Sequence, residues 1–157
     1  MKLSLRGLSK SYGWTRQPAL FDIHLEISPG KIVAVVGANG AGKTTLLRLL
    51  STLAVPTAGE ILFDGERLHR DRIDLRKRLF FLADTPVMFD YKSIAGHLAA
   101  VLKIYERDSA ESAAQAADCL AELEILPVIE MQLIKLSRGQ RYKAALTAMF
   151  VADCECG

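Results

Sequence analysis

A glycine-rich run at residues 37–44, GANGAGKT, has the residue types and spacing of a loop that binds phosphate groups. Its pattern, G-x-x-x-x-G-K-[ST], places backbone N–H groups at a helix N-terminus, which attracts an anion as dense as a triphosphate. The glycines let the backbone bend around phosphate without a Cβ clash. Lys43 is placed to reach the β- and γ-phosphates, and the Thr44 hydroxyl is a hard oxygen suited to Mg²⁺. The run therefore predicts nucleotide binding.

The flanking residues predict the strand and the helix that must position this loop. Residues 32–36, IVAVV, form a continuous apolar run, which is typical of a buried parallel strand. A helix is expected from Lys43, because the leucines at 46, 47, 49, 50 and 53 give it a broad apolar face. Partly alternating apolar residues predict strands near residues 3–8 and 20–27. Short strands are also expected at residues 61–63 and, buried, at residues 79–82.

The second half of the chain predicts helices. Ser93 is a plausible N-cap for a helix through about Tyr105, and Ser109 for an alanine-rich helix that ends before Pro127. Ser137 could cap a final helix. We expect a strand-rich first half followed by an all-helical part.

Three further segments resemble motifs of the ABC ATPases. LSRGQ at residues 136–140 resembles the LSGGQ signature, PTAGEILFDG at residues 56–65 resembles PTSGEILFDG, and residues 9–13 resemble the opening LSKSYG. With the phosphate loop, the resemblance covers essentially the whole chain in order. It implies an α/β fold: a P-loop NTPase core with an antiparallel β portion, in residues 1–85, and a helical signature subdomain, in residues 86–157.

The resemblance also implies roles for individual residues. Tyr12 matches the aromatic residue that stacks on adenine; the alternatives are that it packs in the core or that Trp14 takes its place. Ser137 and Gly139 match positions that contact the γ-phosphate of a nucleotide held by a second subunit, although Ser137 could also simply cap its helix. The nucleotide-binding residues so implied are Tyr12, Gly37, Asn39, Gly40, Ala41, Gly42, Lys43, Thr44, Thr45, Ser137, Gly139 and Gln140.

Two positions depart from the family pattern. Arg138 replaces the first glycine of the signature, which adds a cation near a phosphate-facing helix end. Asp84 stands where the family has its Q-loop glutamine. A carboxylate can ligate Mg²⁺ directly or through water, so Thr44 and Asp84 are the candidate metal ligands. The alternative is that Asp84 is only a loop residue.

The hydrolytic groups of the family have no match in the chain. In the family, a strand ending in Asp-Glu follows the signature helix; its aspartate serves Mg²⁺ and its glutamate is the general base, and a switch histidine follows. None of Asp153, Glu155, His69 and His97 has the context to replace them. We therefore expect a fragment that lacks the C-terminal part of the core and has no ATPase activity of its own.

The resemblance implies the ATP-binding subunit of an ABC transporter, which uses ATP and Mg²⁺ to couple ATP hydrolysis to transport. Its expected partners are a second ABC ATPase subunit and an integral membrane permease, on the cytoplasmic face of the cell membrane. The alternatives are a soluble ABC ATPase of translation or DNA repair, which usually has tandem cassettes or long inserts, and a non-hydrolysing nucleotide-binding module. A net charge of +2 gives no reason to expect a nucleic-acid partner. The apolar runs are too short to span a bilayer, and three cysteines without a C-x-x-C pair argue against a disulfide framework.

Overall fold

The computed structural model of the protein describes residues 1–13 and 17–156. The chain divides into two units, Met1–Arg78 and Leu79–Gly157. The first unit contains the sheet and the glycine-rich loop, and the second contains the long helices. This distribution confirms the mixed α/β class with an antiparallel β portion and a helical part.

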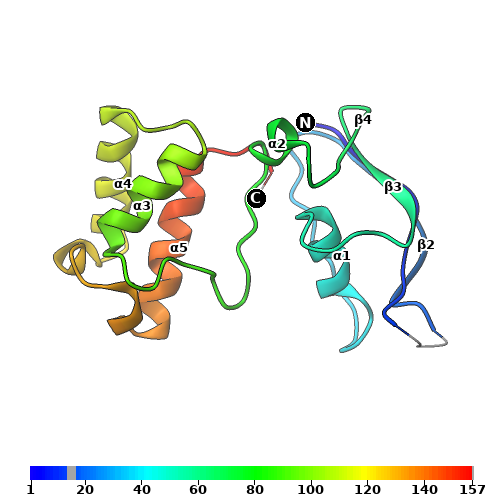
Figure 1. The fold of residues 1–157 in the computed structure, drawn as a ribbon, viewed down its shortest axis with the longest axis horizontal. Coiled ribbons are helices and arrows are strands. Elements are labelled where there is room, and N and C mark those ends of the chain that lie inside the picture. Colours follow the sequence, from blue (N-terminus) through cyan, green and yellow to red (C-terminus); the bar gives the residue numbers. More distant parts are fainter. Residues whose placement is uncertain (14–16, 157) are drawn as a thin grey trace. The chain divides into compact units, whose positions relative to one another are not determined.

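A four-stranded antiparallel sheet forms the first unit, in the order β2-β1-β3-β4 (Figure 1). Its strands are β1 (Leu3–Lys10), β2 (Leu20–Ile27), β3 (Ala58–Phe63) and β4 (Glu66–Arg67). Three leucines of β1, Leu3, Leu5 and Leu8, are all buried, and the pairing with β2 shifts register between Leu5 and Leu8. In β3, Ile61, Leu62 and Phe63 are buried in succession. The strands expected near residues 3–8, 20–27 and 61–63 are therefore confirmed.

Two helices complete the first unit: α1 (Lys43–Leu50) directly follows the glycine-rich loop, and α2 (Ile73–Arg76) is a single turn. The start of α1 at Lys43 agrees with the sequence pattern. Of its leucines, Leu46 and Leu49 are buried, whereas Leu47 is 43% exposed. The apolar face of α1 is thus only partly covered within the described residues.

The buried strand predicted at residues 32–36 is wrong for this structure. Residues 31–38 have no regular secondary structure, and the side chains of Ile32 and Val36 are 103% and 89% exposed. A strand that is apolar on both faces becomes buried only when neighbouring strands and covering helices lie against it. Among the described residues, the sheet contains no strand paired with this run.

The second unit is built from α3 (Ile94–Ile104), α4 (Ala110–Glu122) and α5 (Arg138–Ala152), with short 3₁₀ turns η1 (Leu126–Val128) and η2 (Leu133–Lys135). The predicted caps are confirmed. Ser93 Oγ accepts the N–H of Gly96, and Ser109 Oγ accepts the N–H of Ser112. Each serine satisfies an N–H group that has no partner inside the helix, which explains where the helix begins.

Helix α5 packs against both α3 and α4 (Figure 1). One apolar cluster joins the three helices with the turns between α4 and α5. Its members are Ile94, Leu98, Val101, Leu102, Ala116, Leu120, Ile125, Leu133, Leu136, Ala144, Ala148 and Val151. The small alanines of α4 and α5 let the helix backbones approach closely, while leucine and isoleucine fill the remaining space.

The strand predicted at residues 79–82 forms only an isolated bridge. Leu79 is buried and pairs in parallel with Cys156, and the N–H of Phe80 donates to the Cys156 carbonyl at 2.7 Å. Phe81 and Leu82 are only half-buried. A single bridge does not give the repeated hydrogen bonds of a strand, so the prediction is wrong beyond Leu79.

Candidate nucleotide-binding site

A cavity of about 300 Å³ opens at the glycine-rich loop of the first unit. It is lined by Ala19, Asn39, Gly40, Gly42, Lys43, Thr44 and Thr45. Six of these seven residues are among those implied by the sequence, and Ala19 is the addition. The wall is therefore formed mainly by the loop and the first turn of α1.

The backbone at the junction of loop and helix is suited to an anion. The first N–H within α1 to find a helical partner is that of Leu46, which donates to the Gly42 carbonyl at 2.9 Å. The three amides before it, from Lys43 to Thr45, have no earlier helical carbonyl to bind. These amides carry the positive end of the helix dipole, which is where a phosphate group is stabilised.

Gly42 makes the close turn into α1 possible. Its φ angle is +89°, and a Cβ atom on it would lie 2.4 Å from the carbonyl oxygen of Ala19 and 2.8 Å from Leu20 Cδ2. Only glycine fits this left-handed conformation at such a short approach. Ala19 was not predicted from the sequence, because its contact with Gly42 crosses more than twenty residues of chain.

The ammonium group of Lys43 folds back over the loop. Its Nζ donates to the carbonyl oxygens of Gly37 and Ala38, at 2.8 and 2.7 Å. These bonds hold the cation close to the loop backbone, and Lys43 is one of the residues that line the cavity. The residues present therefore fit a nucleotide phosphate: a cation, first-turn amides, and the Thr44 hydroxyl as an oxygen for Mg²⁺.

Tyr12 is partly exposed at the end of the segment that follows β1. The residue is 43% exposed, and Lys10 Nζ lies 5.1 Å from the centroid of its ring. Tyr12 is not among the described residues that line the loop cavity. The core-packing alternative is not what the structure shows, because a core aromatic would be covered. Trp14, the other candidate, lies outside the described residues.

The signature residues form the exposed N-terminus of α5 in the second unit. Ser137 Oγ accepts the N–H of Gln140 at 3.2 Å, and Gln140 Oε1 accepts the N–H of Ser137 at 3.0 Å. This reciprocal pair is a capping box, so the capping role of Ser137 is confirmed. The Ser137 O–H and the Gln140 side-chain NH₂ are not used as donors in the box. Arg138 and Gly139 are both exposed beside them.

Asp84 lies at a bend of the second unit and is exposed. Its Oδ1 accepts the N–H of the next residue, Thr85, at 2.9 Å. A carboxylate in this setting is open to solvent and to a metal ion. Its role as a metal ligand stays a prediction.

Two titratable side chains of the second unit, His97 and Cys154, are buried or half-buried. His97 is 5% exposed, its ring contacts Phe89 edge-on at 5.5 Å, and burial, followed by the charge of Arg141, lowers its pKa. Burial also raises the pKa of the Cys154 thiol to about 11. An imidazole that is buried against Phe89 is out of reach of a substrate in solution, and a protonated thiol is a poor nucleophile.

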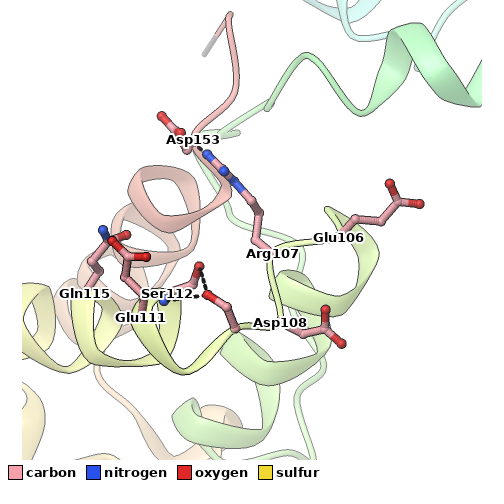
Figure 2. A pocket seen from close by; sticks show the side chains of 8 residues that line it. Glu106, Arg107, Asp108, Glu111, Ser112, Gln115 and Asp153 are labelled. Carbon is pink, nitrogen blue, oxygen red and sulfur yellow. Dashed lines mark hydrogen bonds and ion pairs between the residues drawn. The ribbon is translucent and has the colours of Figure 1, made fainter.

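A larger cavity of about 530 Å³ lies where α4 begins and α5 ends (Figure 2). Its wall is rich in carboxylates, and Arg107 is paired with Asp153. Figure 2 shows Glu106, Asp108 and Glu111 directed to different sides and not to a common point. Within the part of the chain that the structure describes, no group of three such side chains could hold a metal ion. This cavity is therefore not a candidate metal site.

Comparison with known proteins shows that one family model covers both the glycine-rich loop and residues 136–140. A family model described as "ABC transporter" matches residues 20–156. That range contains the glycine-rich loop, Asp84 and the N-terminus of α5. Strand β1, Tyr12 and Ala19 of the cavity wall precede it.

Curated relatives agree with this match. The sulfate/thiosulfate import ATP-binding protein CysA of Caulobacter vibrioides is 33% identical over 94% of the chain. The methionine import ATP-binding protein MetN of the same organism is 29% identical over 92% of the chain. An ATP-dependent lipid A-core flippase of Methylococcus capsulatus is 35% identical over 92% of the chain. The chain spans 44%, 45% and 25% of these relatives, so it corresponds to less than half of each.

Solved structures show the same fold. The ATP-binding subunit of an ABC transporter aligns with a TM-score of 0.88 at 26% identity, over 98% of this chain and 63% of the other. An ABC transporter ATP-binding protein described as putative, from Pyrococcus furiosus, aligns with a TM-score of 0.80 at 29% identity, over 98% of this chain and 72% of the other. No helix within residues 1–13 and 17–156 combines the length and apolar character that crossing a membrane requires.

Proposed function

The chain belongs to the ABC transporter family, and we propose that it binds Mg²⁺-ATP through residues 37–45 as part of a transporter's ATP-binding subunit. The observation that carries the proposal is the arrangement of Lys43 over the loop. Its Nζ is held by the carbonyls of Gly37 and Ala38 next to a cavity lined by the first turn of α1. A triphosphate needs both a cation and directed N–H groups, and this arrangement supplies both.

Each part of the site has a separate task in this proposal. The amides at the start of α1 bind the phosphate oxygens, and Lys43 neutralises the charge on the β- and γ-phosphates. Thr44 contributes a hydroxyl oxygen to Mg²⁺, and Asp84 contributes a carboxylate. Tyr12 stacks on the adenine ring, which tolerates different bases because every base presents a π-face. When bound, the metal ion would neutralise part of the negative charge of the phosphate groups.

The signature end of α5 serves a second nucleotide in the same proposal. Ser137 and Gly139 lie at an exposed helix N-terminus, and the capping box leaves the Ser137 O–H free to donate. These groups contact the γ-phosphate of ATP held by a second ABC ATPase subunit. The partner that couples this binding to transport is an integral membrane permease, so the protein acts on the cytoplasmic face of the membrane. The relatives named as import ATP-binding proteins and as a flippase support a transport role.

The test is a calorimetric titration of the chain with Mg²⁺-ATP, with Lys43→Ala as the variant. The variant loses a charge-assisted contact worth about 1.5–3 kcal/mol, so its affinity should fall tenfold or more. Lys31→Ala is the matched control, because Lys31 is exposed and does not line the cavity. Equal affinity of Lys43→Ala and Lys31→Ala would refute the assignment of the site.

A further inference from the structure

One arginine joins the first turn of α5 to two other segments of the second unit. The N–H of Arg141 donates to the Ser137 carbonyl at 2.9 Å, which places it one turn after the cap. Its guanidinium reaches out of the helix: Nη1 donates to the Leu133 carbonyl at 3.0 Å, and Nη2 donates to Asp90 Oδ1 at 2.7 Å. Arg141 thus bonds to the segment that precedes α3, through Asp90, and to the segment that precedes α5, through Leu133.

The two segments that receive these bonds are themselves paired. The N–H of Ile134 donates to the Asp90 carbonyl and that of Leu133 to the Lys92 carbonyl, each at 3.0 Å. Ser93 and Gln132 continue the pair as an antiparallel bridge. The guanidinium therefore binds to a small platform formed by two segments that are hydrogen-bonded to each other. This platform, residues 90–93 with residues 132–134, is the surface against which the start of α5 is held.

The Arg141 guanidinium is more enclosed than the charged groups of an ordinary surface ion pair. Leu133 is fully buried, and the side chains of Arg141 and Asp90 are 23% and 45% exposed. Exposed pairs contribute little because water screens them, whereas a fork that bonds two acceptors at a half-buried site is held in one geometry. The apolar packing of Leu136 and Ala144 also holds α5, but packing of this kind has little directional preference.

We propose that Arg141 is a positioning residue that orients the N-terminal turn of α5, and with it Ser137 and Gly139, through its bonds to Asp90 and Leu133. The capping box cannot perform this task, because both of its partners belong to the same turn. Charge-assisted bonds to groups outside the helix set its direction. The inference rests on the proposed function, in which Ser137 and Gly139 face a phosphate group and must present their donors at one place.

The experiment measures amide hydrogen exchange on the complete chain without nucleotide. The reporting amides are those of Ile134, bonded to Asp90, and Gln140, bonded to Ser137. In Arg141→Gln, both should exchange about tenfold faster than in the unmodified chain, because the platform and the first turn open more often. Asp90→Asn keeps the bond from Arg141 to Leu133, so its effect should be smaller. If Arg141→Gln does not fold, Asp90→Asn serves as the test variant in its place.

A matched control lies at the opposite end of the same helix. Arg107 is paired with Asp153, which caps the C-terminus of α5. Arg107→Gln also removes one ion pair from α5, but it should leave the exchange of Ile134 and Gln140 unchanged. Unchanged rates for both amides in Arg141→Gln and Asp90→Asn would overturn the proposal. Equal acceleration of all α5 amides, including that of Ala148, would also overturn it, because it would show a general loss of stability.

The conservative variant Arg141→Lys tests whether the charge of Arg141, and not only its bulk, orients the first turn of α5. Arg141→Lys keeps the charge but has a single nitrogen, so it should restore the exchange rates part of the way. No rescue at all would show that the charge pair with Asp90 plays no part, and would overturn the proposal. The exchange experiment contains no nucleotide. Failure of the chain to bind Mg²⁺-ATP would therefore refute the proposed function without changing what the exchange rates say about Arg141.

Discussion

The backbone of Gly42 lies so close to Ala19 that a Cβ atom would come within 2.4 Å of the Ala19 carbonyl oxygen. Gly40 offers a comparison within the same loop. Its φ angle is +81°, close to the +89° of Gly42, but a Cβ on it would meet nothing within 4 Å. The two glycines therefore separate the cost of a left-handed backbone from the cost of a steric overlap.

We predict that Gly42→Ala destabilises the protein more than Gly40→Ala. Gly40→Ala has only the backbone cost, about 1–2 kcal/mol, whereas the overlap in Gly42→Ala adds roughly another 1–3 kcal/mol. Urea unfolding of both variants measures the difference. Gly42→Ala should also weaken ATP binding, because the first turn of α1 must shift away from Ala19. Equal free energies of unfolding for the two variants would contradict the close contact between Gly42 and the Ala19 carbonyl.

Asp84 should influence the Mg²⁺ dependence of nucleotide binding. Its carboxylate is exposed and accepts one backbone N–H, from Thr85. Asp84→Asn removes the charge that attracts the metal, so half-maximal Mg²⁺ for ATP binding should rise on the order of tenfold. Asp84→Gln introduces the glutamine that the ABC ATPases have at this position, so the variant should still bind Mg²⁺-ATP. Asp118→Asn, on the exposed side of α4, is the control; three identical Mg²⁺ titrations would exclude the metal role of Asp84.

His97 should make the stability of the protein fall in mild acid. Burial, and then the charge of Arg141, lowers the pKa of His97 below that of an unfolded histidine, about 6.5. Between the two values the unfolded chain binds the proton and the folded chain does not, so the free energy of unfolding decreases as pH falls through this window. Above the unfolded pKa the imidazole is neutral in both states and stability is at its full value.

The measurement is urea unfolding at several pH values between 7 and 5. His97→Gln removes the titrating group, so its stability should depend less steeply on pH in this interval than that of the unmodified protein. Every other ionisable group is the same in both proteins, so the difference between the two curves reports on His97 alone. Parallel curves would show that the folded protein accommodates the protonated ring.

Local hydrogen bonding made much of the fold predictable from the sequence. Ser93, Ser109 and Ser137 each bond an amide three residues later, so the signal and the contact lie in the same short segment. The start of α1 was predictable for a similar reason, because the loop and the first helical turn are contiguous. The sheet strands followed from apolar residues whose partners also lie in the first unit.

Contacts between distant segments were not predictable in this way. The exposed run at residues 32–36 has the composition of a buried strand, but burial depends on which strands lie beside it and not on its own residues. The pair formed by Asp90 and Arg141 spans 51 positions and follows no periodic pattern. Ala19 likewise has no chemical feature that would mark it as a wall of the loop cavity.

The last prediction concerns hydrolysis, for which the chain offers few acidic groups after the signature. Asp153 and Glu155 follow α5 directly, so neither ends a buried strand. Asp153 ends the helix in a left-handed conformation with a φ angle of +47°, and its carboxylate is paired with Arg107. A general base must lie within hydrogen-bond reach of the attacking water and be free to accept its proton. An ion-paired helix cap is poorly suited to that role.

We therefore predict that the 157-residue chain binds Mg²⁺-ATP but releases phosphate no faster than its Lys43→Ala variant. Phosphoryl transfer depends on positioning and charge neutralisation, and the loop supplies both for the nucleotide. It supplies nothing that orients the attacking water. A continuous phosphate-release assay on both proteins measures the difference. Turnover that disappears in Lys43→Ala would show that a base is present within these residues. Asp153→Asn and Glu155→Gln would then identify it, because only loss of the acting carboxylate would abolish phosphate release while leaving ATP affinity unchanged.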